Sequence, residues 1–266
     1  MSSAGSIPFD RAADVYDETR RLTAEASAAT TDALKDELGG RGPALEIGVG
    51  TGLIALPLAQ AGVRVVGLDL SGPMLAKVVE KADGEMPFPL VIGDATRLPF
   101  GDDRFGGGYA RHVLHLIAEW RAALAELVRV IAPGGVLLVN LGFSEGPWEE
   151  VGAHMDEQLG RDGHRVVGLD FDATVELDEA MAAFGAPHRD LPEVWQQSRR
   201  TLDRYFAEIE GRAFSWTWRV PPERLSAAVA ETKRWASERF GAFDRVLEPR
   251  FRSVWRAYDL PGQTPA

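Results

Sequence analysis

Short apolar runs recur through the first half of the chain, and polar side chains do not alternate within them. The strongest runs cover residues 44–47, 63–69, 90–94 and 136–139. A weaker candidate, 105–110, contains three consecutive glycines, which disfavour a strand. Runs of this kind are typical of strands that a parallel sheet buries on both faces.

Helical segments separate these runs. Residues 119–130 place Leu124, Leu127 and Val128 at helical spacing, and residues 53–61 and 73–82 also predict helices. Alternating strands and helices build a doubly wound α/β sheet. We therefore expect such a sheet between residues 44 and 142.

Both flanks of this region are predicted to be mostly helical. Residues 7–38 are rich in alanine, lack Gly and Pro between Phe9 and Leu38, and end at Gly39-Gly40. Beyond Gly142 the regular alternation stops, and a polar stretch containing Arg161 to His164 separates two helical segments. Helices are expected at 148–159, 175–184, 201–210 and 222–240, and strands at 193–198 and 250–258.

Three glycines follow the first apolar run at alternate positions. Gly48, Gly50 and Gly52 allow a sharp turn from strand to helix and let a ligand approach the main chain closely. Free amides at the start of the next helix favour a polar or anionic group there. A dinucleotide site would place its third glycine at position 53, which is Leu53, so the spacing argues against NAD. A purely structural turn is the alternative for the triplet taken alone.

Two acids end the next two apolar runs. Asp69 can accept hydrogen bonds from the two hydroxyls of a ribose, and Asp94 can accept one from an exocyclic amine. In open α/β sheets, ligands bind at the carboxyl ends of adjacent parallel strands. Each acid alone could instead cap a helix or lie in a loop. Together they predict a cleft for a ligand that carries both a ribose and an amine.

These motifs resemble those of the class I methyltransferases that use S-adenosylmethionine. Leu45–Gly52 resembles the first motif, whose acid and glycines surround the methionine end of the cofactor. Val66–Leu75 is similar to the second motif, Gly93–Phe100 to the third, and Arg129–Gly135 to the turn before the fifth strand. Phe9–Asp17 resembles the N-terminal lid helix of the branch that includes ubiquinone/menaquinone-type and many small-molecule methyltransferases.

The resemblance, which covers about residues 7–142, implies a fold and a cofactor. The expected fold is α/β, a doubly wound, Rossmann-like, mostly parallel seven-stranded sheet with an N-terminal helical lid and a mostly helical C-terminal substrate cap. Residues 1–40 would form the lid, 41–142 the cofactor-binding core, and 143–266 the remaining sheet with inserted cap segments. The implied cofactor is S-adenosyl-L-methionine, with S-adenosyl-L-homocysteine as its product.

The resemblance also assigns residues to that cofactor. Asp69 would bind the ribose, with Leu70 and Met74 beside the adenine, and Asp94 would bind the adenine amine. The full expected set is Tyr16, Arg20, Glu46, Gly48, Gly50, Gly52, Asp69, Leu70, Met74, Asp94, Ala95 and Arg111. Tyr16 and Arg20 lie one helical turn apart and could close over the carboxylate end of the cofactor; the alternative is a core tyrosine and a solvated arginine.

Two histidines follow the fourth predicted strand. Methyl transfer is an in-line displacement at a sulfonium carbon, so positioning and desolvation can carry much of the acceleration. A base is needed when the acceptor must lose a proton, and His112 and His115 are the candidates because His titrates near neutral pH. Either could instead cap the next helix, bond to the backbone or face solvent.

The C-terminal third is expected to supply the acceptor pocket. Residues 212–218 alternate as a strand would, which would place Trp216 and Trp218 on one face, either to stack on a flat acceptor or, more often, to fill the core. Arginines 199, 200, 204, 212 and 219 could meet an anionic acceptor, although a solvated face is the default for each. The expected acceptor is therefore a small molecule, aromatic or anionic, and a homodimer stays open.

Composition narrows the function classes. The 266 residues include 29 Lys plus Arg and 40 Asp plus Glu, and the net charge of −11 argues against extended nucleic-acid binding. Residues 199–256 are mildly basic, however, with 13 Lys plus Arg against 8 Asp plus Glu, so an anionic small acceptor stays compatible. The absence of Cys removes disulfides and thiolate metal sites, and no metal site is expected. Because no apolar run approaches the length of a membrane helix and the N-terminus is polar, we expect a cytoplasmic enzyme without a membrane partner.

The expected activity is methyl transfer to oxygen, nitrogen or carbon of a small molecule. One alternative is methylation of RNA or protein, which the lack of a recognisable RNA-binding domain disfavours. Gly142-Phe143-Ser144 also stands where the amine-methylating branch has Asn/Asp-Pro-Pro-Tyr. A second alternative is a protein of this fold that binds the cofactor for non-methylating catalysis or regulation.

Overall fold

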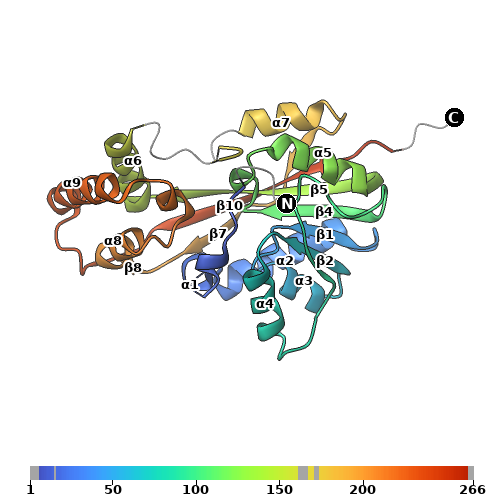
Figure 1. The fold of residues 1–266 in the computed structure, drawn as a ribbon, viewed down its shortest axis with the longest axis horizontal. Helices are drawn as coiled ribbons and strands as arrows, with labels where there is room; N and C mark the ends of the chain where they lie inside the picture. Colours follow the sequence, from blue (N-terminus) through green and yellow to red (C-terminus); the bar gives the residue numbers. More distant parts are fainter. Residues whose placement is uncertain (1–5, 15, 161–166, 171–173, 263–266) are drawn as a thin grey trace. The chain divides into compact units, whose positions relative to one another are not determined.

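The chain forms two compact units in a computed structural model that describes residues 6–14, 16–160, 167–170 and 174–262 (Figure 1). The first unit comprises residues 1–141, 167–194 and 253–266. The second comprises residues 142–166 and 195–252. The predicted polar stretch at Arg161 to His164 lies outside the described residues.

The first unit contains the sheet and the helices that cover it. Its strands are β1 (Ala44–Ile47), β2 (Val65–Asp69), β3 (Leu90–Ile92), β4 (Phe105–Arg111), β6 (His188–Asp190) and most of β5 (Ile131–Glu145) and β10 (Arg250–Asp259). Its helices are α1 (Tyr16–Arg20), α2 (Ala24–Leu38), α3 (Ala55–Gln60), α4 (Gly72–Lys81), α5 (Trp120–Val130) and α7 (Thr174–Ala182), with 3-10 turns η1 (Asp10–Ala12) and η2 (Leu114–Leu116).

The strand order is β3-β2-β1-β4-β5-β10-β6, and β7 (Val194–Gln197) pairs with β10 outside this path. β1 runs parallel to β2 on one side and to β4 on the other. β2 also runs parallel to β3, and β4 to β5, whereas β6 is antiparallel to β10. The expected doubly wound, mostly parallel sheet is therefore confirmed, with eight strands where seven were expected because the short β7 joins it.

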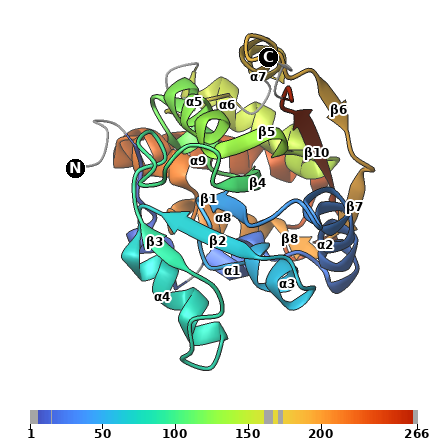
Figure 2. The same ribbon diagram turned by 90° about the vertical axis from the view of Figure 1, so that its right-hand side faces the viewer.

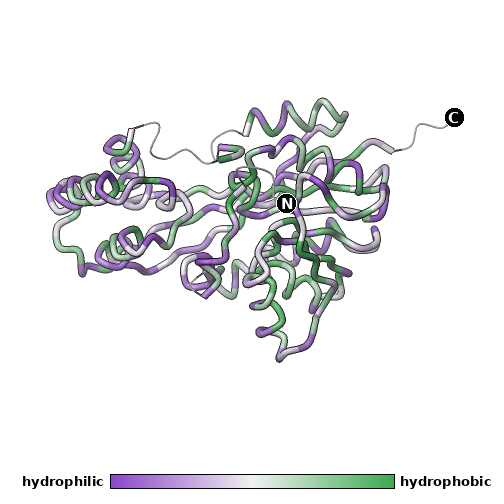
Figure 3. The backbone as a smooth tube through the Cα atoms, viewed as in Figure 1, coloured by the Kyte–Doolittle hydropathy of each residue, from purple (hydrophilic) through white to green (hydrophobic). Residues whose placement is uncertain are grey.

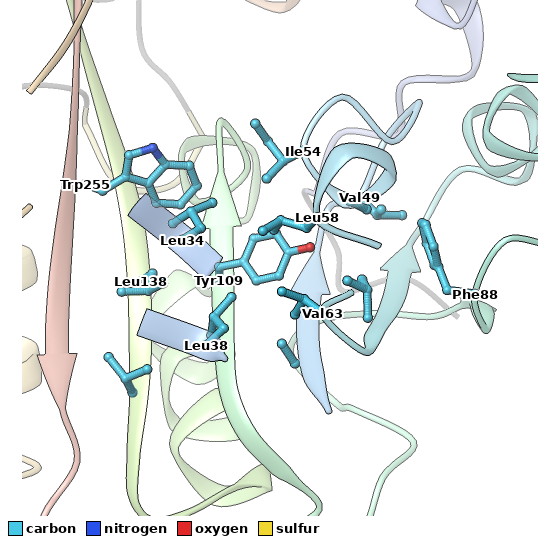
Figure 4. Packing of buried hydrophobic residues seen from close by; sticks show 14 of the residues in the cluster. Leu34, Leu38, Val49, Ile54, Leu58, Val63, Phe88, Tyr109, Leu138 and Trp255 are labelled. Atoms are coloured by element: carbon cyan, nitrogen blue, oxygen red, sulfur yellow. The ribbon is translucent and has the colours of Figure 1, made fainter. Parts of the chain in front are cut away.

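Helices cover both faces of this sheet. Residues of α2, α3 and α4 share one buried cluster on one face, and Figure 2 shows α5 and α7 on the other. Figure 4 shows Tyr109 of β4 and Trp255 of β10 lying in that cluster beside Leu34 and Leu38 of α2. In Figure 3 apolar and polar residues alternate along the helices, as expected for helices with one face on a core.

Side-chain hydrogen bonds cap the first turns of α2 and α4. The Thr23 hydroxyl accepts from the Ala26 amide (3.2 Å) at the start of α2, and the Ser71 hydroxyl accepts from the Met74 amide (3.3 Å) at the start of α4. Such caps satisfy amides that have no partner within the helix. The Thr23 cap also explains why the prediction of helix throughout residues 7–38 is wrong. Thr23 is extended, so η1 and α1 are separate short elements before α2.

The glycines of β4 have a packing reason that composition alone did not show. A Cβ at Gly106 would lie 1.8 Å from the Arg41 carbonyl oxygen, and one at Gly107 would lie 2.6 Å from Leu38 Cδ2. The strand therefore passes against the end of α2 and the turn that follows it, where no side chain fits. The predicted strand at 105–110 is confirmed.

The second unit is mostly helical. Its elements are α6 (Pro147–Leu159), α8 (Leu202–Glu210), α9 (Pro222–Phe240), the 3-10 turn η3 (Ser215–Trp218) and the hairpin strands β8 (Arg200–Thr201) and β9 (Val246–Leu247). The three predicted helices are confirmed within two residues at each end. Met155, Phe206, Ile209 and Val229 lie in its core, and several aromatic side chains pack around them.

The prediction of a strand over residues 212–218 is wrong, because this segment forms a turn and the 3-10 helix η3. Arg212 adopts a left-handed φ of 57°, and its carbonyl accepts from the Trp218 indole N–H (2.7 Å). The Thr217 hydroxyl donates to the Phe214 carbonyl (2.6 Å). Trp216 and Trp218 therefore do not share a strand face. Trp216 packs against the core of this unit, which was the alternative.

Candidate functional site

A pocket of the first unit lies where the carboxyl ends of the first strands meet the glycine turn. Its lining residues come from the N-terminal segment, the glycine turn, the ends of β2 and β3, and the segment after β4: Ser6, Ile7, Phe9, Tyr16, Gly48, Gly50, Leu68, Asp69, Leu70, Met74, Gly93, Asp94, Ala95, His112, Val113, Leu116 and Ile117. It holds a cavity of about 70 Å³, and residues of the N-terminal segment form part of its wall.

The glycine turn has the backbone shape that the sequence predicts. Gly48, Gly50 and Gly52 have φ values of 66°, 55° and 78°, in the left-handed region that favours glycine. A Cβ at Gly50 would lie 3.3 Å from Met74 Cε, and both residues line the pocket, so a side chain at position 50 would crowd it. Gly52 does not line the pocket; its amide donates to the Val49 carbonyl (2.9 Å) and closes the turn.

Asp69 lies at the end of β2 and fixes the turn. Its Oδ2 accepts from the Gly50 amide (2.8 Å), and its Oδ1 accepts from the Ser71 amide (2.9 Å). Burial raises the pKa of Asp69, and these backbone hydrogen bonds act in the opposite direction. The carboxylate therefore links the ends of β1 and β2 while facing the pocket.

Asp94 occupies the corresponding place after β3. Its Oδ1 accepts from both the amide (2.9 Å) and the hydroxyl (2.8 Å) of Thr96. These bonds form a local turn that fixes the position of the carboxyl group. Leu70, Met74 and Ala95 line the same pocket, so this predicted group is brought together.

Glu46 and Arg111 lie one layer deeper and do not line the small cavity. Glu46 in β1 is 2% exposed and Arg111 at the end of β4 is 8% exposed. Burial raises the pKa of Glu46 well above its usual value. The positive charge of Arg111 acts to lower that pKa, so the two groups interact electrostatically. Burial lowers the pKa of the Arg111 guanidinium. Opposite charges buried next to the glycine turn are the strongest electrostatic feature of the site.

The N-terminal helix is attached over the glycine turn by Asp17. Its carboxylate accepts from the Thr51 hydroxyl (2.5 Å) and pairs with Lys81 of α4, whose ammonium also donates to the Thr51 carbonyl (2.8 Å). Tyr16 consequently lines the pocket, and burial raises the pKa of its hydroxyl. Arg20 does not line it, although its charge reaches Tyr16, Arg111 and both histidines.

The two candidate bases differ in position. His112 lines the pocket and has a left-handed φ of 51°, a strained conformation for a residue with a side chain. His115 lies in η2 and does not line the pocket. Burial lowers the pKa of both rings, that of His115 to about 3, with Arg20 contributing to each. Both imidazoles are therefore neutral near pH 7, and His112 is the one placed to meet a ligand.

The buried His115 predicts an acid-sensitive fold. An imidazole with a folded pKa of about 3 and an unfolded pKa near 6.5 stabilises the protein above pH 6.5, and this contribution falls as the pH drops toward 3. Between pH 7 and pH 5, we expect the free energy of unfolding of the wild type to fall by about 2 kcal/mol more than that of His115→Gln. Urea unfolding at both pH values measures the difference. Equal losses in the two proteins would contradict a buried neutral imidazole.

Sequence reasoning missed several lining residues. Val113, Leu116 and Ile117 follow His112, and their apolar spacing after a strand end was the available signal. Ser6 and Ile7 gave no signal, because their place depends on a long-range backbone bond from the Ile7 amide to the Leu116 carbonyl (3.2 Å).

The arginines considered for an anionic acceptor are mostly engaged within the second unit. Arg200 and Arg204 both pair with Glu208 (3.0 Å each), and Arg199 lies 3.6 Å from Glu248. Arg212 donates to the carbonyls of Thr217 and Val220. Arg219 is exposed.

Comparison with known proteins identifies the domain that carries this pocket. Residues 45–139 match the family described as methyltransferase domain. The demethylmenaquinone methyltransferase of Mycobacterium bovis is 38% identical over 136 residues, which cover 49% of this chain and 55% of that protein. Residues 45–139 therefore carry a methyltransferase domain. The chain spans about half the length of the curated relatives it matches.

Two solved structures have a similar fold. The YcgJ protein of Bacillus subtilis aligns with a TM-score of 0.58 at 18% identity, over 89% of this chain and all of that one. The [4+2]-cyclase SpnF aligns with a TM-score of 0.53 at 19% identity, over 88% of this chain and 82% of that one. At this level of identity the likeness concerns the fold alone, not the reaction.

Neither a cluster of metal-binding side chains nor a membrane-spanning helix is present in the described residues. Within those residues no group of three or more His, Cys, Asp or Glu side chains could hold a metal ion. None of their helices combines the length and apolarity needed to cross a membrane.

Proposed function

We propose that the chain transfers a methyl group from S-adenosylmethionine to a small-molecule acceptor. The observation that carries the proposal is the convergence of Asp69 and Asp94 on one pocket beside the glycine turn. The similarity to the named relatives covers about half of each chain, so it supports the cofactor half and assigns no acceptor.

The pocket fits the nucleoside end of this cofactor. Each carboxylate oxygen of Asp69 accepts one backbone amide and keeps a second lone pair that can accept from a ribose hydroxyl. Leu70, Met74 and Ala95 offer apolar contact to the adenine, and Asp94 lies in the place for its amine. An acid and apolar walls at adjacent strand ends are what a purine nucleoside requires.

Glu46 and Arg111 fit the methionine end. The cofactor carries an ammonium and a carboxylate on one carbon, and this chain buries one acid and one guanidinium at the same strand ends. Glu46 Oε2 is buried and has no hydrogen-bond partner among the described residues. An ammonium would satisfy it, which offsets the cost of burying an unpaired polar atom.

The cofactor, when bound, supplies a methyl group activated by a sulfonium. The residues of the chain bind and orient it, and the apolar side chains of Ile7, Phe9 and Ile117 exclude water from the pocket. His112 is neutral near pH 7 and can hold a proton only weakly, because burial and the charges of Arg111 and Arg20 lower its pKa.

The proposal predicts direct binding of the product. Isothermal titration calorimetry with S-adenosylhomocysteine should show one site per chain with a micromolar dissociation constant, because a drug-sized ligand with several charge-assisted contacts reaches that range. NADH is the matched control and should give no heat, since Leu53 replaces the third glycine of a dinucleotide site. No heat with S-adenosylhomocysteine would overturn the cofactor assignment.

A further inference from the structure

Tyr109 and Glu46 lie opposite each other at the centre of the sheet. They are register partners on β4 and β1, so their side chains leave the same face a few ångströms apart. Tyr109 is fully buried and Glu46 is 2% exposed. Figure 4 shows the Tyr109 ring held among Leu34, Leu38 and Leu58, so the phenol has little freedom to move.

Both side chains bury a polar atom that lacks a partner. Within the described part of the chain, neither the Tyr109 hydroxyl nor Glu46 Oε2 has a hydrogen-bond partner of good geometry, yet the two side chains lie near enough for a hydrogen bond from Tyr109 to lower the pKa of Glu46. The charged and titratable groups that act on Glu46 are Tyr109, Arg111 and Asp69. Asp69 already accepts from two backbone amides. The phenol hydroxyl can donate a hydrogen bond and the carboxylate oxygen can accept it. If both atoms stayed unpaired, their burial would cost several kcal/mol of folding free energy.

We propose that Tyr109 is a positioning residue whose hydroxyl donates to the ionised Glu46 and holds that carboxylate ready for the ammonium of the cofactor. The inference rests on the proposed function, because it gives Glu46 an ammonium to bind. Tyr109 itself does not line the pocket.

The chemistry explains why this carboxylate needs a donor. Burial favours the protonated form of Glu46 and raises its pKa, and the negative charge of Asp69 acts in the same direction. A protonated Glu46 could not pair with an ammonium. A donated hydrogen bond from Tyr109 and the charge of Arg111 both favour the ionised form, so the two groups act against the effect of burial.

Tyr109→Phe is the direct test, because it keeps the ring in the core and removes only the hydroxyl. We expect S-adenosylhomocysteine to bind about 10- to 100-fold more weakly at pH 7, the worth of one hydrogen bond to a charged group. Because binding needs ionised Glu46, affinity should fall with decreasing pH, and the midpoint of that fall should move to higher pH in Tyr109→Phe. In a Glu46→Gln background, Tyr109→Phe should have no further effect on affinity.

Tyr258→Phe is the matched control. Tyr258 is also fully buried in the sheet of the first unit, and its hydroxyl donates to Asp178 (2.8 Å), away from the pocket. It should leave both the affinity and the pH midpoint unchanged. If the two variants behave alike, the effect of Tyr109→Phe is a general loss of a buried hydroxyl and the positioning role is wrong.

A second readout separates this inference from the proposed function. Carbon-13 NMR of labelled glutamate in the ligand-free protein reports the pKa of Glu46 directly, and Tyr109→Phe should raise it by about one unit, a tenfold change in proton affinity. An unchanged Glu46 titration overturns the inference even if the wild type binds S-adenosylhomocysteine. A raised Glu46 pKa without wild-type binding would overturn the cofactor assignment alone.

Discussion

Asp69→Ala should weaken the binding of S-adenosylhomocysteine at least about 100-fold, because two hydrogen bonds to a charged group are each worth about 1.5–3 kcal/mol. The carboxylate would lose its bonds to the ribose hydroxyls and also release the amides of Gly50 and Ser71 that it now holds. Calorimetry at pH 7.5 measures the change. Asp36→Ala, an exposed acid of α2, is the control and should bind as the wild type does.

The backbone role of Asp69 makes a second variant necessary. Asp69→Ala should lower the melting temperature by several degrees, because the glycine turn loses two anchors. Asp69→Asn keeps an oxygen that can accept from one amide, and should recover part of that stability while binding stays weak, since an amide nitrogen accepts nothing. Wild-type affinity in a folded Asp69→Asn protein would show that Asp69 does not bind the ribose.

The sheet and its covering helices were predictable because their signals are local. Strands buried on both faces must be apolar throughout, and this is why 44–47 and 136–139 stood out as strands. The helix α9 was predicted from Pro222 to Phe240 and found there, because Pro at its first turn and Gly241 after its end mark both limits. The glycines and acids of the site could also be predicted, because they come at or directly after the apolar strands in the sequence.

The missing parts depend on contacts that a sequence does not show. The capping bond of Thr23 divides a segment whose composition is helical throughout. The N-terminal residues reach the pocket through the bond between Ile7 and Leu116, more than 100 residues apart in sequence. Tyr109 looked like one apolar residue of a strand, and only its register against Glu46 shows a hydroxyl beside an acid.

The positions of the two histidines illustrate the same limit at smaller scale. They lie three residues apart, and the sequence offered both as bases. His112 has a left-handed backbone and lines the pocket, whereas His115 lies in η2 and does not line it. No local pattern in the sequence predicted this difference between the two candidates.

Among glycine-to-alanine substitutions in the site, Gly48→Ala should lower the stability of the protein the most. A Cβ there would lie 2.4 Å from Val113 Cγ2 and 2.7 Å from Val113 Cβ, and the residue has a φ of 66°. Left-handed strain of about 1–2 kcal/mol and overpacking of about 1–3 kcal/mol predict a loss of about 2–5 kcal/mol in the free energy of unfolding. Urea unfolding measures it.

Gly62→Ala separates the two causes. Gly62 also has a positive φ, of 91°, but a Cβ there meets nothing within 4 Å, so only backbone strain should appear, about 1–2 kcal/mol. Val113 adjoins His112 and lines the pocket. The folded fraction of Gly48→Ala should therefore also bind S-adenosylhomocysteine at least tenfold more weakly, while Gly62→Ala binds as the wild type does. Equal destabilisation by the two variants would mean that the turn does not press against Val113, and that the segment carrying His112 is not held by Gly48.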